Sequence, residues 1–230
     1  MGAFFRNSIF AGAALTLASY EIGQIIRKKY RSALFHPLFL ASVIVILILK
    51  IFQIEYEDYF RSARYISFYL TPATVCLALP LYDQLHLLKR NARAAAAGIM
   101  SGTLTSFLSV YLLARWFRLS RQEYATLLPK SITTAIGIEI SEELGGIISV
   151  TTAVILMSGI FGSLMAEFIF KICKIEDPIA RGIALGTASH AVGTAKAMES
   201  GGEEGAMGSF AIVASGLVSV LLAPVFVKLF

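Results

Sequence analysis

Long apolar runs, separated by short polar segments, follow one another along most of the chain. The run from Leu38 to Phe52 is too long for a core strand and lacks the alternation of a half-buried strand. Several runs approach the roughly 20 residues that a helix needs to cross a bilayer. We expect about eight membrane segments, at residues 8–26, 36–53, 64–82, 93–116, 127–144, 147–170, 178–198 and 206–228. The pattern predicts an all-α, polytopic helical membrane protein.

The composition supports that class. Of the 230 residues, 57% are hydrophobic and 15% charged, whereas a soluble domain carries roughly 45–50% and about 25%. The net charge of +5 does not indicate a nucleic-acid partner, because the basic residues cluster at the ends of apolar runs. Cys76 and Cys173 each lie in an apolar run without paired spacing. We therefore expect them to be packing residues, with neither a disulfide nor a metal site.

Charged residues between the runs predict an orientation. Four basic residues lie at positions 27–31, which places that loop in the cytoplasm and the N-terminus outside. The acidic loop around Glu55 fits the outside, and the basic loop from Leu87 to Arg93 returns to the inside. The basic residues between Arg115 and Lys130 would fall outside if every segment spans. Either that bias is tolerated, or one segment is re-entrant or lies on the membrane surface.

A faint internal repeat is also present. Laying the chain on itself without gaps places Met100–Gly102 on Met157–Gly159 and Pro72 on Pro129. Such matches also arise by chance in apolar sequence, so both a duplication and a coincidence stay open. A duplication would give repeat units near residues 62–118 and 119–175 inside a single transmembrane domain of residues 1–230. Repeats with proline-interrupted helices at corresponding positions indicate the binding site of a secondary transporter.

Both corresponding segments combine proline with hydroxyl side chains. Pro72 and Pro80 free helix carbonyls that Thr74 can help to satisfy, although an ordinary kinked helix fits as well. Pro129 is expected to start a helix, because proline is favoured in a first helical turn. The N-terminal end of that helix would carry free N–H groups and hydroxyls that suit a small anion. Its candidate ligands are Ser131, Thr133 and Thr134. Lys130 lies beside them, or it marks the membrane interface.

A third segment starts at Asp177-Pro178, which has the pattern of a helix N-cap followed by proline. Three glycines and a histidine then share one helical stripe, which allows close approach of another backbone: Gly182, Gly186, His190 and Gly193. His190 is a functional candidate because it is an ionisable residue in a membrane segment. Lys196 either reaches the interface or contacts an anion. The acidic stretch at residues 199–206 is expected to form the turn before the last segment.

The stretches "LTPATVCLALPLY", "LPKSITTAIGIEISEELGGI" and "DPIARGIALGTASHAVGTAKAME" resemble the LrgB/CidB family of bacterial membrane proteins. One departure is Ala135, where the family commonly has proline. The resemblance implies the bacterial inner membrane and an antiholin-like control of murein hydrolase activity and lysis. It also implies a small holin-like partner of the LrgA/CidA type. Because the family includes the plastid glycolate/glycerate transporter and members linked to pyruvate uptake, it equally implies a carrier.

The residues favour the carrier, because lipid penalises hydroxyls, a histidine and broken helices unless they line a cavity. We expect a homo-oligomeric secondary transporter of small 2-oxo or 2-hydroxy monocarboxylates, such as pyruvate or glycolate. Substrate-binding candidates are Thr74, Ser131, Thr133, Thr134, His190 and Lys196, with His190 also carrying the coupled proton. No cofactor, metal or enzymatic activity is implied. The rival hypotheses are regulation of lysis and a purely structural role beside a small pore protein.

Overall fold

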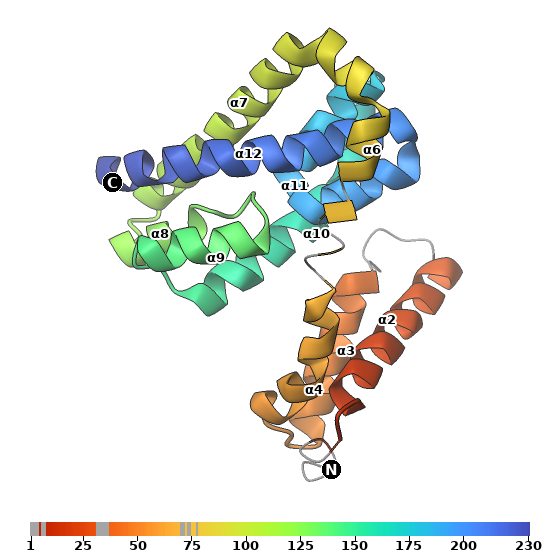
Figure 1. The fold of residues 1–230 in the computed structure, drawn as a ribbon. Coiled ribbons are helices and arrows are strands. Elements are labelled where there is room, and N and C mark those ends of the chain that lie inside the picture. Colours follow the sequence, from red (N-terminus) through yellow and green to blue (C-terminus); the bar gives the residue numbers. More distant parts are fainter. Residues whose placement is uncertain (1–4, 6–7, 31–36, 70–71, 73–74, 77) are drawn as a thin grey trace. The chain divides into compact units, whose positions relative to one another are not determined.

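The computed structural model describes residues 5, 8–30, 37–69, 72, 75–76 and 78–230. All regular elements of this described part are helices, which confirms the predicted all-α class (Figure 1). The chain forms two compact units, Met1–Cys76 and Leu77–Phe230. Thr74, one of the predicted binding residues, lies outside the described residues.

The first unit contains α2 (Ala11–Tyr30), α3 (Pro37–Ile51) and α4 (Tyr56–Phe68), and α2 packs against both of the others. Gly12 of α2 lies directly against the carbonyl oxygen of Tyr59, so a side chain at this position would clash with the α4 backbone. The backbone N–H of Gly12 donates to Oγ of Ser62 over 2.7 Å. A glycine therefore permits the close α2–α4 contact.

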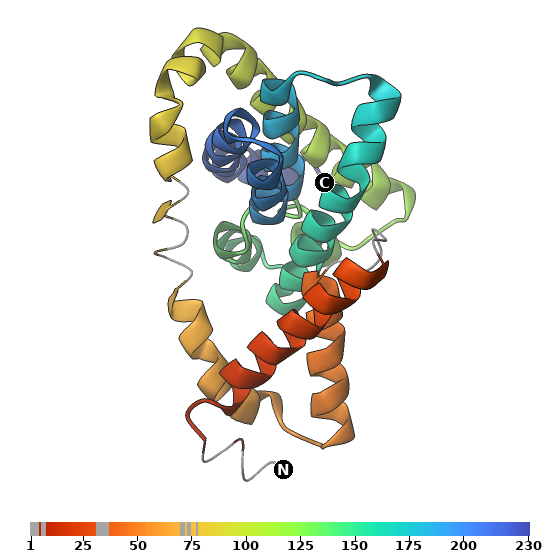
Figure 2. The same cartoon turned by 90° about the vertical axis from the view of Figure 1, so that its right-hand side faces the viewer.

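In the second unit α11 (Pro178–Ser200) packs against α7, α10 and α12 (Figure 2). Gly182 and Gly186 of α11 lie against the carbonyl oxygens of Glu204 and Gly208 of α12, which confirms close helix contact at these two positions. The other helices of this unit are α6 (Ala78–Asp83), α7 (Leu85–Trp116), α8 (Arg121–Leu127), α9 (Thr134–Glu143), α10 (Ile148–Cys173) and α12 (Gly202–Leu229).

Three helices of the described part are long and apolar enough to cross a membrane: Lys89–Trp116, Ile148–Cys173 and Gly202–Leu229. We call them the candidate spans. The helix Pro37–Ile51 is apolar but shorter. These helices support a helical membrane protein, and among the described helices three, not eight, are both long and apolar enough to span. The segment at 64–82 contains α4 and α6, which are separate helices, together with residues outside the described part.

The segment predicted at 127–144 is not one helix. A capping box starts α8 at Ser120, where Glu123 N–H donates to Ser120 Oγ and Ser120 N–H donates to the Glu123 carboxylate. Residues 128–133 then form turns, and α9 begins only at Thr134 with Thr133 as its N-cap. The prediction that Pro129 starts a helix is therefore wrong. With ten residues, α9 is about 15 Å long, half of the roughly 30 Å of a bilayer core.

A buried hydroxyl network holds α8, α9 and α10 together around this turn. Thr151 of α10 donates from Oγ1 to the carbonyl oxygen of Thr126 in α8 over 2.9 Å. Because that bond uses the Thr151 proton, Ser141 of α9 donates to Thr151 over 2.6 Å. The backbone N–H of Ile147 donates to Thr126 Oγ1 over 2.8 Å. The network fixes both sides of the turn at 128–133.

Helix α11 is interrupted at His190, whose backbone has φ 42° and ψ −130°. The four residues predicted on one helical stripe therefore do not share one partner. Gly182 and Gly186 face α12, and His190 lies against Gly159 of α10. Gly193 lies against the preceding part of α11 itself, at Leu185 and Ser189. The prediction of one continuous stripe is wrong because a positive φ at a residue with a side chain breaks the helical repeat.

Two further predictions are corrected. The stretch at 199–206 is not a turn, because α11 continues to Ser200 and α12 begins at Gly202, with only Gly201 between them. Cys76 and Cys173 are free, as expected, but both are exposed and so are not packed in the core. The internal repeat stays a prediction.

Candidate functional site

A cavity of about 720 Å³ lies between α7 and α11. The two helices run in the same direction along it, since Gly98 lies beside Ile183 and Gly102 lies beside Thr187. Small residues of both helices create the space. The lining also includes Asp177, which precedes α11, and Lys130 and Ser131 of the turn at 128–133.

The Lys130 ammonium group is held by two serine hydroxyls in the cavity wall. Its Nζ donates to Ser131 Oγ over 2.9 Å and to Ser106 Oγ over 3.3 Å. Ser106 Oγ in turn donates to Ser131 Oγ over 2.9 Å. Because Ser131 accepts both bonds, its own hydroxyl proton remains available to a bound group. The third ammonium proton of Lys130 and the Ser131 hydroxyl proton can therefore be donated to a bound group, and we call Lys130, Ser131 and Ser106 the lysine–serine cluster.

The lysine–serine cluster lies beside the middle of a helix that is long and apolar enough to cross a membrane. Ser106 belongs to the candidate span Lys89–Trp116 and is in its middle half. Among the described residues, no carboxylate forms an ion pair with Lys130, whose two hydrogen-bond partners are neutral hydroxyls. A charged group at this depth is costly unless it is paired or faces a polar cavity. The arrangement is therefore suited to a small anion that enters the cavity.

His190 is buried, with 3% of its surface exposed. Its Nε2–H donates to the carbonyl oxygen of Ile155 over 2.9 Å. It does not line the cavity, but Thr187 and Ala188 do, within the turn that precedes the break in α11. His190 is therefore placed behind the cavity wall, and its role as the coupling residue stays a prediction.

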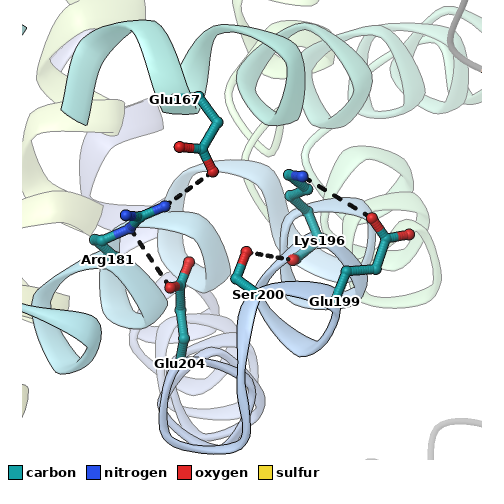
Figure 3. Close-up of polar contacts among 6 residues, drawn as sticks. All are labelled: Glu167, Arg181, Lys196, Glu199, Ser200 and Glu204. Atoms are coloured by element: carbon teal, nitrogen blue, oxygen red, sulfur yellow. Dashed lines mark hydrogen bonds and ion pairs between the residues drawn. The ribbon is translucent and has the colours of Figure 1, made fainter. Parts of the chain in front are cut away.

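The predicted second anion contact lies elsewhere. Lys196 Nζ is 3.9 Å from the Glu199 carboxylate, one turn along α11, and neither residue lines the cavity (Figure 3). In the same view Arg181 lies between two carboxylates, with Nη2 2.9 Å from Glu167 and Nε 3.4 Å from Glu204. Lys196 already has a carboxylate partner, unlike Lys130.

Of the predicted binding residues that the structure describes, only Ser131 lines the cavity. Thr133 and Thr134 are at the start of α9, as expected, but do not line the cavity. Sequence reasoning missed Ser106, noted Thr187 only as a hydrogen-bonding residue near His190, and left Lys130 undecided. A signal was present, because small and hydroxyl residues recur every three or four positions in α7: Gly98, Ser101, Gly102, Thr105 and Ser109. Within the described residues no three His, Cys, Asp or Glu side chains gather as metal ligands would.

The fold and the cavity define a helical membrane protein with a lysine-bearing cavity between two helices. The sequence model of the LrgB-like family matches residues 16–229, so the chain belongs to that family. It is 37% identical to the holin-like protein CidB of Staphylococcus aureus over 216 residues, which is 94% of each chain. It is 39% identical to the antiholin-like protein LrgB of Bacillus subtilis over 223 residues, or 96% of each chain. No solved structure matches the chain.

Proposed function

We propose that the protein regulates cell lysis from the bacterial inner membrane, as the names of its relatives suggest. Relatives named holin-like and relatives named antiholin-like both match the chain over nearly its whole length. The similarity is the single observation that carries this proposal, and the candidate spans fit a membrane role. The regulation would act on murein hydrolase activity and would involve a small holin-like membrane protein of the LrgA/CidA type.

Removing the gene from its host tests this function. Autolysis and murein hydrolase activity are compared between the wild type, the deletion strain and the complemented strain. Increased lysis in the deletion strain indicates an antiholin-like role, and decreased lysis indicates a holin-like role. Unchanged lysis and unchanged murein hydrolase activity contradict the proposal. Co-purification with the small partner from the host membrane checks the proposed complex.

A second candidate function is a carrier for small monocarboxylates of the pyruvate or glycolate type. The observation that favours it is the lysine–serine cluster, in which Lys130 has hydroxyl partners and a cavity in front of it. A carboxylate bound there would receive charge-assisted hydrogen bonds from the ammonium group and a further bond from a serine hydroxyl. Two interrupted segments, at 128–133 and at His190, border this region, as in carriers that bind at broken helices.

Uptake of labelled pyruvate into proteoliposomes that contain only this chain tests the carrier. We expect uptake by the wild type and its loss in Lys130→Met, which keeps a long side chain but removes the charge. Lys171→Met is the matched control, because Lys171 is exposed in the last turn of α10 and does not line the cavity. Lys196→Met separately tests the predicted second anion contact. Absence of uptake in both directions of the proton gradient contradicts a stand-alone carrier.

A further inference from the structure

Helix α11 folds back on itself at His190. A Cβ built on Gly193 would touch the carbonyl oxygen of Leu185, eight residues earlier in the chain. Eight residues of a continuous helix extend over about 12 Å, so the helix axis must reverse between these two positions. The first arm, residues 178–189, and the second arm, residues 191–200, are therefore antiparallel, and we call the two arms together hairpin 178–200.

The two arms stay side by side away from the turn. A Cβ built on Gly208 of α12 would lie 3.3 Å from Cβ of Ala197 in the second arm and 3.5 Å from the carbonyl oxygen of Gly182 in the first. In a continuous helix, Gly182 and Ala197 would be about 22 Å apart. The two ends of α11 therefore lie at the same end of the hairpin, which we call its base.

The turn of the hairpin lies beside the middle of two candidate spans. Thr187 contacts Gly102 in the middle of α7, and His190 contacts Gly159 near the middle of α10. At 1.5 Å per residue the longer arm is about 18 Å long, a little over half of the roughly 30 Å of a bilayer core. With 23 residues α11 is long enough to span, but it is not among the candidate spans of the described part. Each arm thus covers about half of the membrane.

The base of the hairpin has the charges of a membrane face. Arg181, in the first turn of α11, pairs with Glu167 near the end of α10 and with Glu204 in the first turn of α12 (Figure 3). The end of α10 and the start of α12 therefore meet at the base. Lys174 and Glu176, between α10 and α11, are exposed there, and exposed charges are far less costly at the surface of a bilayer than inside it.

A counterpart of this hairpin lies at the other end of α10. The buried hydroxyl network holds Thr126 of α8 and Ser141 of α9 against Thr151, one turn into α10. Four residues earlier in α9, Gly137 contacts α10 one turn further along. Helix α9 therefore starts near the middle of α10 and ends near its beginning, where α8 also lies. We call residues 121–143 hairpin 121–143.

The shift that reveals the internal repeat also relates the two hairpins. Moving the chain by 57 positions lays residues 100–102 on 157–159, and it lays 121–143 on 178–200. In each copy a candidate span, α7 or α10, precedes the hairpin. Because α7 runs beside the first arm in the same direction and α10 in the opposite one, the two copies have inverted orientation.

The cavity extends from the lysine–serine cluster toward the base of hairpin 178–200. On α7 its lining runs from Asn91 to Ser109, over about 27 Å, and the cluster bonds to α7 near the Ser109 end. Asp177, at the base, is part of the lining. Leu128 and Ile132, before and after the lysine and serine of the turn, belong to a buried core with α7, α9 and α12. This packed core closes the cavity toward the other face.

We propose that hairpins 121–143 and 178–200 are re-entrant: each turns near the middle of the membrane and leaves by the face from which it entered, and the two enter from opposite faces. The cavity opens toward the face of hairpin 178–200, so a solute reaches the lysine–serine cluster from that face. Lipid does not tolerate irregular backbone at this depth, but protein covers both turns, since Ser189, His190 and Ser131 are 1%, 3% and 8% exposed. The proposal goes beyond the functions proposed above, because it holds for a carrier and for a lysis regulator alike.

Cysteine labelling in sealed membranes tests the two hairpins. Cys76 and Cys173 are first replaced by serine, and single cysteines are then introduced at exposed positions. Glu176→Cys and Ser200→Cys lie at the two ends of hairpin 178–200. Intact cells expose one membrane face to a membrane-impermeant maleimide, and inverted vesicles expose the other. We expect both variants to react in the same preparation and in that one alone, whereas a spanning α11 would place them on opposite faces.

Gln122→Cys and Glu143→Cys, both at exposed positions, test hairpin 121–143 in the same way. We expect them to react together, in the preparation that leaves Glu176→Cys unlabelled. Two members of either pair that react in different preparations overturn the proposal, and so does reaction of all four variants in one preparation. A neighbouring exposed residue, Glu199 or Glu142, takes the place of a variant that does not fold.

The direction of the cavity is tested at the depth of the turn. Ala188 lines the cavity, whereas Phe161 lies on α10 between Gly159 and Gly162, which contact the turn, and does not line the cavity. We expect Ala188→Cys to react in the preparation that labels Glu176→Cys, because a thiol reacts as the thiolate, which needs contact with water. Phe161→Cys is the control and should react in neither preparation.

Three results would overturn the proposed opening of the cavity. They are reaction of Ala188→Cys only from the other face, its failure to react from either face, and equal reaction of Phe161→Cys, since the reagent would then reach this depth without the cavity. Labelling needs neither transport nor lysis. Failure of this proposal is therefore distinguished from failure of either proposed function.

Discussion

His190 of α11 and Ile155 of α10 are joined by a 2.9 Å hydrogen bond from the imidazole Nε2 to the backbone carbonyl oxygen. A carbonyl oxygen only accepts, so Nε2 carries the proton in this arrangement. Any exchange of a proton at neutral imidazole therefore falls to Nδ1. The hydrogen bond also connects α11, at the residue where this helix is interrupted, to the backbone of α10.

Gly159→Ala should destabilise the protein through His190. A Cβ at this position would lie 2.5 Å from Cε1 and 2.6 Å from Nε2 of the imidazole, so the ring must move and its bond to Ile155 is lost. We expect the free energy of unfolding to fall by about 1–3 kcal/mol. Thermal unfolding of the purified protein measures it. Gly202→Ala is the control, because nothing lies within 4 Å of a Cβ there; equal melting temperatures for both variants would contradict the prediction.

His190→Gln should separate structure from proton coupling. The glutamine amide can still donate a hydrogen bond toward Ile155, but it does not titrate. If His190 carries the coupled proton, the variant folds and binds pyruvate yet no longer accumulates it in response to a proton gradient. Uptake into proteoliposomes with and without the gradient measures this. Gradient-driven uptake equal to that of the wild type would show that another residue carries the proton.

Arg181 should be coupled more strongly to Glu204 than to Glu167. Its contact with Glu167 is shorter, 2.9 Å against 3.4 Å, but the side chain of Glu167 is 54% exposed and that of Glu204 only 6%. Water screens the exposed pair, which is worth at most about 1 kcal/mol. Removing one partner of the buried pair leaves an uncompensated charge and should cost about 2 kcal/mol more.

Double-mutant cycles measure the two couplings. Arg181→Gln is combined with Glu204→Gln in one cycle and with Glu167→Gln in the other, and unfolding free energies are compared. The matched Gln substitutions keep side-chain size and remove only the charge. A coupling to Glu167 that equals or exceeds the coupling to Glu204 would show that contact distance, and not burial, decides the strength.

The capping box of α8 should make stability depend on pH. Hydrogen bonds from the Ser120 backbone N–H and hydroxyl lower the pKa of Glu123, which is outside the candidate spans. Because the pKa of Glu123 is lower in the folded state than in the unfolded state, the charged carboxylate stabilises the fold at pH values above the unfolded-state pKa. This stabilisation is lost as the pH falls through the folded-state pKa. From pH 7 to pH 4 the wild type should lose more stability than Glu123→Gln. Equal losses would mean that the capping bond does not depend on the charge.

The long apolar helices were predictable from the sequence because their signal is local. The run that becomes α10 and the run that becomes α12 each carry enough hydrophobic residues to span a bilayer whatever their neighbours are. The N-cap at Asp177 is local too: its side chain accepts from the N–H of Ala180 over 2.8 Å, as the Asp-Pro pair predicts.

The candidate site was predictable only in part. The pattern of hydroxyls after Pro129 pointed to Ser131, which lines the cavity, whereas Ser106 and Thr187 come from helices far away in the sequence. Their hydroxyls become a site only when α7 and α11 pack side by side at Gly98 and Gly102. From the sequence alone, a serine or threonine in a helix cannot be told from an ordinary packing residue, because its hydrogen-bond partners are not known.

The sequence by itself determined the helical membrane class and the family, since length, hydropathy and contiguous motifs are properties of the chain alone. It also indicated, within a few residues, where α3, α10, α11 and α12 begin and end, but not the bounds of α4, α6, α8 and α9. The tertiary structure alone decided that Lys130 faces a cavity and Lys196 a carboxylate, because both are single lysines beside apolar residues in the sequence. It also decided the break at His190, since a residue with a side chain holds a positive φ only where surrounding contacts, here Ile155 and Gly159, stabilise it.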